Sequence, residues 1–179
     1  MSHFFHLYLC FSLLFFLVQC GFCVNLNKTC AKIVQGDPYN VKFDFCVTSL
    51  QVVPENHRTS LRELGNVSLN LTKSNASHTL GYINNLLKRN MKPDMKSCLT
   101  SCQELYANSI SSLNEAMNCV GNQHFDDANI QVTAAMDAPT TCEDGFREGK
   151  GTVSPLSKRN SDAFQLGAIS LTIINMLSK

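Results

Sequence analysis

Most of this chain repeats an apolar residue every three or four positions, the spacing that gathers side chains on one face of an α-helix. Four stretches carry the repeat: Thr59 to Asn90, Pro93 to Val120, Phe125 to Phe146, and Leu166 to Leu177 behind the N-cap candidates Asn160, Ser161 and Asp162. No stretch sustains the alternation of period two that a strand requires. The pattern therefore predicts an all-α protein with four long amphipathic helices.

Short breaks separate these helices. Pro93 ends the first and starts the second, because proline cannot continue a helix but fits its first turn. Gly121-Asn122 separates the second from the third, and Pro139 inside the third should kink it or loosen a turn. Since short connections join antiparallel neighbours, we expect an up-down-up-down four-helix bundle over residues 58–179.

The cysteines suggest covalent links between antiparallel segments. Cys30 and Cys46 are equally far from the turn around Pro38, as in a stapled hairpin. Cys98 and Cys102 lie one turn apart on the second helix, so by spacing either one could meet Cys142 on the third. Cys98 and Cys119 would be roughly 31 Å apart along one helix, which is beyond disulfide reach.

The first 23 residues read as a cleavable signal peptide. They contain no Asp, Glu, Lys or Arg, and the apolar run from Phe4 to Val18 is shorter than the roughly 20 residues of a membrane span. Small residues at Gly21 and Cys23 favour cleavage after Cys23, with cleavage after Cys20 as the alternative. We therefore expect a secreted protein that has no membrane segment after cleavage.

Four Asn-x-Ser/Thr sequons are candidate glycosylation sites, at Asn27, Asn66, Asn70 and Asn75. A thiolate and imidazole set of Cys98, Cys102 and His124 could in principle hold zinc, but an oxidising compartment disfavours free thiolates. We therefore expect no metal and no cofactor.

Several function classes fit the sequence poorly. The net charge is +1 with both signs interspersed and there is no Trp, so nucleic-acid binding is not expected. No nucleophile elbow, zinc-protease motif or phosphate loop occurs, which disfavours catalysis. The neighbouring acids Asp126-Asp127 and Glu143-Asp144 diverge on a helix and indicate a solvated face, or for Asp126-Asp127 a favourable charge near a helix N-terminus. A small-ligand carrier with a cavity in the bundle remains a distant alternative.

Several stretches, in this order and spacing, resemble the plant invertase and pectin methylesterase inhibitor family. They read TCAKIVQGDPYNVKFDFCVTSL from Thr29, SCQELYANS from Ser101, TCEDGF from Thr141 and LGAISLTIINML from Leu166. The resemblance covers the mature chain, residues 24–179, and is greatest to the family's invertase inhibitors of the pollen-allergen group. It implies a helical hairpin over residues 24–57 in front of the bundle, with disulfides Cys30–Cys46 and Cys102–Cys142. Cys98 and Cys119 are then left as buried thiols, or one of them links a dimer of an otherwise monomeric protein.

The resemblance implies a secreted inhibitor that docks on a plant invertase and blocks its substrate cleft. The family's invertase inhibitors carry a Pro-Lys-Phe tripeptide where this chain has Gln123-His124-Phe125. Phe125 either contacts the enzyme or begins the core stripe of the third helix, and His124 would supply positive charge only when protonated, near or below pH 6.5. Pectin methylesterase is the alternative target, and a pollen protein without strong inhibition is a third reading. The expected location is the apoplast, with the vacuole as an alternative.

Overall fold

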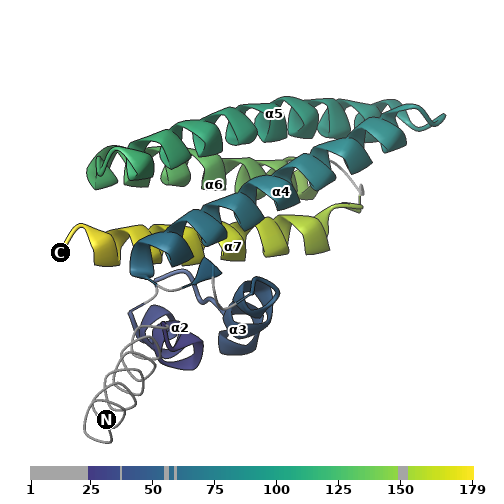
Figure 1. The fold of residues 1–179 in the computed structure, drawn as a ribbon. Helices are drawn as coiled ribbons and strands as arrows, with labels where there is room; N and C mark the ends of the chain where they lie inside the picture. The colour runs from purple at the N-terminus through teal and green to yellow at the C-terminus, as the bar shows by residue number, and fades with distance from the viewer. Residues whose placement is uncertain (1–23, 37, 55–56, 59, 149–152) are drawn as a thin grey trace, which may run out of the picture.

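The computed structural model describes residues 24–36, 38–54, 57–58, 60–148 and 153–179, and this part of the chain is helical without strands. The predicted signal peptide, residues 1–23, lies outside the described residues. The helices are α2 (Leu26–Gln35), α3 (Phe43–Gln51), α4 (Leu61–Leu87), α5 (Pro93–Gly121), α6 (Phe125–Glu148) and α7 (Ser157–Leu177). Helices α4 to α7 form an up-down-up-down bundle, and the α2–α3 hairpin packs against α7 and α4 (Figure 1). The predicted fold class is confirmed.

Local sequence signals explain most helix ends. The Ser60 side chain caps α4 by accepting a hydrogen bond from the Glu63 backbone N–H at 3.1 Å. Helix α5 begins at Pro93, in the first turn, where the missing N–H has no intrahelical partner to lose. Helix α4 is shorter than its predicted range of Thr59 to Asn90.

The predicted start of the last helix is wrong. We expected an N-cap at Asn160 to Asp162, but α7 begins at Ser157, and the Asn160 backbone N–H already bonds to Leu156 O at 2.8 Å. The Asn160 side chain is 3% exposed and accepts a hydrogen bond from the Tyr106 hydroxyl on α5 at 2.8 Å. Asn160 is therefore a polar contact inside the bundle, where it has a partner that local sequence does not reveal.

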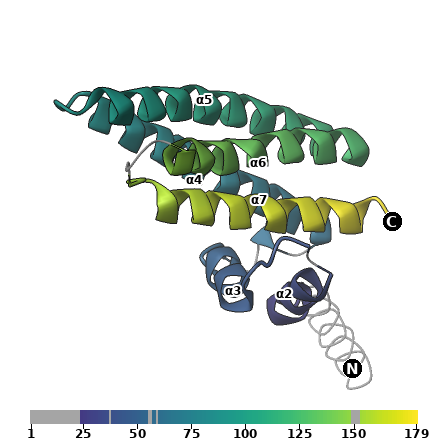
Figure 2. The same ribbon diagram turned by 180° about the vertical axis from the view of Figure 1, so that it is seen from behind.

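Helix α7 is buried on most of its circumference, because it packs on α4 and α6 and also carries the hairpin (Figure 2). The Lys42 backbone N–H donates to the Gln165 side chain at 3.1 Å and thereby ties the hairpin to α7. On the bundle side, the hydroxyls of Thr72 and Ser170 lie 3.0 Å apart and link α4 to α7. The part of α7 from Leu166 to Ile174 is buried nearly all round, which fits such a central position.

Pro139 lies inside α6, which continues through it. Proline has no N–H, so the carbonyl of Ala135, four residues earlier, loses its normal helical donor. Ser109 on α5 supplies a replacement, with its hydroxyl donating to Ala135 O at 3.0 Å in a buried position. The neighbouring helix thus satisfies the carbonyl that proline leaves without a donor.

The described residues contain two disulfides. Cys30–Cys46 closes the α2–α3 hairpin, and Cys102–Cys142 joins α5 to α6 with its Cα atoms 5.0 Å apart. Because Cys102 is bonded to Cys142, it cannot act as a thiolate ligand beside Cys98. Cys98 and Cys119 are free thiols, the first half-buried and the second 9% exposed. Within the described ranges, no helix has the length and apolarity needed to cross a bilayer.

Candidate functional site

The turn between α5 and α6 holds the predicted target-binding residues Gln123, His124 and Phe125, and it lies at the same end of the bundle as the C-terminus (Figure 1). Gln123 and His124 are exposed, whereas Phe125 is half-buried and packs against the core. The structure therefore brings the three residues together at one tip of the bundle.

Backbone hydrogen bonds define the shape of this turn. The His124 N–H donates to Cys119 O at 2.9 Å, and the Gln123 N–H donates to Val120 O at 3.2 Å. These two bonds form a Schellman motif, in which the residue after the helix adopts the left-handed conformation. That residue is Gln123, with φ 64°, where glycine is the usual choice. The expected break at Gly121-Asn122 therefore lies slightly later, because α5 extends through Gly121.

Arg62 at the start of α4 anchors the turn from a third helix. Its Nη2 donates to the carbonyl of Gly121 at 2.7 Å, so a cation caps the carboxyl end of α5. At the other side of the turn, the Ala128 N–H bonds to His124 O at 3.0 Å and starts α6. The backbone is thus fixed on both sides of the exposed side chains.

One acidic side chain, that of Asp127, lies beside the imidazole of His124. Its Nδ1 lies 4.0 Å from Asp127 Oδ2, and both side chains are about two-thirds exposed. Asp126 and Asp127 both occupy the first turn of α6, where negative charge favours the helix dipole. The tip therefore has a positive charge at His124 only when the imidazole is protonated, and carboxylates lie beside it.

Phe125 has a position compatible with both predicted roles. It begins α6 and contributes to the core, yet it is only partly covered by the protein. Its ring can therefore anchor the turn and still present an apolar edge to a partner.

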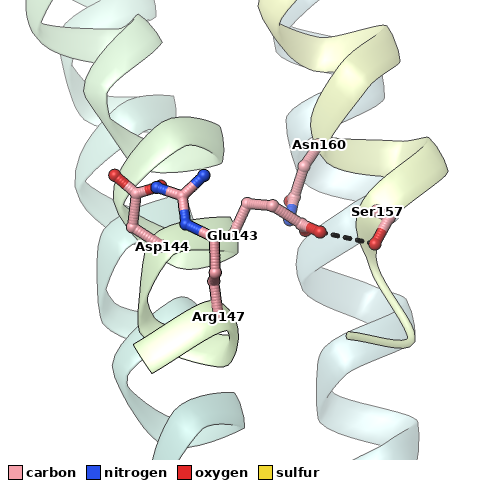
Figure 3. Close-up of polar contacts among 5 residues, drawn as sticks. All are labelled: Glu143, Asp144, Arg147, Ser157 and Asn160. Atoms are coloured by element: carbon pink, nitrogen blue, oxygen red, sulfur yellow. Dashed lines mark hydrogen bonds and ion pairs between the residues drawn. The ribbon is translucent and has the colours of Figure 1, made fainter. Parts of the chain in front are cut away.

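A polar network between α6 and α7 was not recognised in the sequence. Glu143 accepts hydrogen bonds from Ser157 at 2.5 Å, Asn160 at 2.6 Å and Ser154 at 2.9 Å, and Figure 3 shows it reaching from α6 to α7. The sequence predicts that Glu143 lies on a solvated face, and this prediction is wrong, because the carboxylate bonds to residues of α7 and the segment before it. Only the position of α7 reveals this role.

The environment of Glu143 changes its pKa. Partial burial alone would raise the pKa, but the hydrogen bonds from Ser157, Asn160 and Ser154, together with nearby Arg147, hold it below the usual value. Arg147 itself pairs with Asp144 one turn away. Glu143 also borders a shallow groove of about 390 Å³ between the hairpin turn and α7.

The four sequons differ in exposure. Asn27 and Asn70 are exposed, whereas Asn66 and Asn75 are half-buried. At 100° per residue, Asn66 and Asn75 point to opposite sides of α4, so the three sequons of this helix do not share one outer face. Asn27 and Asn70 are the more accessible acceptors.

Comparison with known proteins identifies relatives over nearly the whole described chain. The family model described as "Plant invertase/pectin methylesterase inhibitor" matches residues 25–173. A protein from Platanus acerifolia named "Putative invertase inhibitor" is 42% identical over 152 residues, covering 85% of this chain and 84% of the relative. "Pectinesterase inhibitor 2" from Arabidopsis thaliana is 32% identical and covers 93% of each chain.

A solved structure shares the fold. The crystal structure of a mutant form of a pectin methylesterase inhibitor from Arabidopsis matches with a TM-score of 0.71. The match covers 82% of this chain and 95% of the other, at 24% identity. At that identity the likeness supports the helical architecture and no more.

Proposed function

Because this chain belongs to the plant invertase/pectin methylesterase inhibitor family, whose members inhibit enzymes and are not enzymes themselves, we propose that it inhibits a secreted plant invertase. The inhibitor docks on the enzyme, a β-fructofuranosidase, and blocks its substrate cleft. Invertase is preferred as the target because the relative from Platanus acerifolia, at 42% identity, is named for that activity.

The observation that carries the docking proposal is the fixed α5–α6 turn. Its exposed residues Gln123 and His124 project from a backbone held by Arg62 and by the helix-end hydrogen bonds. A surface that is ordered before binding loses little conformational entropy when it enters a cleft. Phe125 supplies an apolar contact next to the polar tip.

Protonated His124 supplies the positive charge for an acidic pocket of the enzyme. Asp127 lies 4.0 Å from it, Asp126 shares the first turn of α6, and Arg62 bonds to the Gly121 carbonyl in the same turn. A His124→Ala variant should therefore inhibit more weakly than wild type at about pH 5. A His124→Lys variant, which keeps a positive charge, should inhibit at least as well as wild type, and unchanged inhibition by His124→Ala would rule out the role of His124.

The docking surface is tested by measuring inhibition of an acid invertase at about pH 5, where imidazole is mostly protonated. Phe125→Ala should weaken inhibition about tenfold or more, because buried aromatic anchors dominate interfaces. Phe43→Ala is the matched control, since Phe43 is 41% exposed on the hairpin and should leave inhibition unchanged. Equal loss in the two variants, or no loss in Phe125→Ala, would contradict docking through the turn.

Pectin methylesterase is the second candidate target. The 32% identity to "Pectinesterase inhibitor 2" over 93% of the chain supports it, as does the exchange of Pro-Lys for Gln123-His124 at the turn. A pollen protein that keeps the scaffold without strong inhibition of either enzyme is the third reading.

The proposed site of action is the apoplast, with the vacuole as the alternative. The predicted signal peptide, the sequons and the two disulfides support an oxidising secretory route. We propose a monomer with no metal or cofactor, which half-buried Cys98 could link into a dimer under oxidising conditions.

A further inference from the structure

A second cavity, of about 440 Å³, lies on the hairpin between the start of α2 and helix α3. Its lining is mostly polar and includes the carboxamides of Asn25, Asn27 and Gln51 together with Arg58. None of these residues belongs to the α5–α6 turn. The cavity falls within the size range of small-molecule sites in proteins.

Arg58 is the unusual member of this lining. Only 9% of it is exposed, and its buried Nε has no hydrogen-bond acceptor among the residues that the structure describes. Its backbone carbonyl accepts a bond from the Val24 N–H at 3.3 Å, so the chain around it is held in place. A guanidinium does not lose its proton in proteins, and a buried charge without a partner costs folding free energy. Arg58 is therefore suited to bind an anion from solution.

The amino end of α2 adds further positive potential at the same place. The Asn25 side chain caps Lys28 N at 2.9 Å, but the first backbone N–H groups of a helix have no intrahelical acceptors. No acidic residue lies in the first turn of α2 to balance the helix dipole. Backbone N–H groups and a guanidinium whose Nε has no acceptor among the described residues together form an anion-binding arrangement.

We propose that this cavity binds a small carboxylate that also carries hydroxyl groups, of the size and chemistry of a sugar acid. Arg58 binds the carboxylate with its planar fork of donors, and the exposed carboxamide of Gln51 bonds to the hydroxyls. Cleavage after Cys23 would place the new α-ammonium group of Val24 at the cavity and strengthen anion binding. The proposal is independent of the target enzyme.

The test uses the oxidised mature chain, Val24 to Lys179, with glucuronate as the probe. Glucose has the same ring without the carboxylate, and sulfate is an oxyanion without hydroxyls, so both serve as ligand controls at equal ionic strength. Binding is measured by calorimetry and by the shift in melting temperature. Glucuronate should bind and raise the melting temperature, whereas glucose should do neither and sulfate should have a smaller effect.

Two variants locate the site. Arg58→Gln should weaken glucuronate binding about tenfold or more, because hydrogen bonds to charged groups are strong. Without ligand it should melt no lower than wild type, since an unpaired buried charge is removed. Gln51→Glu places a carboxylate in the cavity and should raise the ligand-free melting temperature while abolishing the glucuronate response. Arg89→Gln, at an exposed arginine after α4, is the matched control and should bind normally.

Three results would overturn the proposal. Equal responses to glucuronate and glucose would mean that the carboxylate is not recognised, and equal responses to glucuronate and sulfate would remove the hydroxy acid assignment. Unchanged glucuronate binding in Arg58→Gln would show that glucuronate binds at a different site. If Arg58→Gln fails to fold, Gln51→Glu decides, since unchanged glucuronate binding in that variant also contradicts the site.

Discussion

Single polar residues connect the helices of this bundle at defined positions. Asn160 on α7 accepts a hydrogen bond from Tyr106 on α5 and donates one to Glu143 on α6, so three helices meet at one carboxamide. A buried polar group needs its partners in a fixed geometry, and a shift of one helix along another would leave all three groups unsatisfied. Such contacts select one register among the many that apolar stripes permit.

Glu143 should make stability depend on pH in the acidic range. Its pKa is lower in the folded protein than its ordinary value of 4.5, so the stabilisation is present above that value and is lost as pH falls through the folded pKa. Urea unfolding at several pH values below about 5 should show a smaller loss of unfolding free energy in Glu143→Gln than in wild type. Glu104→Gln, at an exposed acid on α5, is the control and should follow wild type. Parallel curves for wild type and Glu143→Gln would refute the network.

The two free thiols should differ in reactivity. Burial raises the pKa of the Cys119 thiol, and Glu115 and Asp127 raise it further, so little thiolate forms at neutral pH. Cys98 is half-buried, with its thiol 3.5 Å from Gly145 O. Mass spectrometry after iodoacetamide treatment of the native protein should find Cys98 alkylated well before Cys119. Equal rates at the two sites would contradict this assignment.

At the scale of elements, helix α7 is placed by a close approach to α6. A Cβ atom added at Gly167 would lie 2.5 Å from Met136 Cγ, so α7 needs a residue without a side chain there. Gly81 on α4 has open space around it and no comparable constraint. Packing therefore requires a glycine at position 167 but not at position 81, although both glycines interrupt a helix pattern in the sequence.

Alanine substitutions should separate the two cases. Gly167→Ala should destabilise the protein by about 1 to 3 kcal/mol, because buried Met136 must move. Gly81→Ala should stabilise it by about 0.5 to 1 kcal/mol through helix propensity. Urea unfolding of the two variants beside wild type measures both changes, and a stabilised Gly167→Ala would disprove the close packing of α6 and α7.

The limits of prediction also differ between elements. Periodicity located all four bundle helices, because burial of one face imposes the 3.6-residue repeat directly on the sequence. It misplaced the start of α7, since Asn160 has the local preference of a cap but is held by Tyr106 and Glu143 from other helices. It also favoured Gly121-Asn122 as the break, whereas the left-handed residue is Gln123. Local propensity gives way where distant partners supply the hydrogen bonds.

For the whole molecule, the sequence predicts the order of the helices and their antiparallel arrangement. It does not predict which residues of distant segments contact each other. Spacing left Cys98 and Cys102 equivalent as partners of Cys142, and the family resemblance implied the Cys102 bond that the structure contains. The turn with Gln123 to Phe125 was located from the same resemblance. The cavity at Arg58 depends on how α2 packs beside α3, which no single stretch encodes.

The function proposed for this rigid bundle is inhibition of an invertase. The most direct measurement titrates the oxidised mature protein into a plant acid invertase and, separately, into a pectin methylesterase, at about pH 5, where imidazole is mostly protonated. We expect invertase activity to fall to a plateau near equimolar inhibitor while pectin methylesterase activity stays constant. Inhibition of pectin methylesterase alone, or of neither enzyme, would contradict the claim.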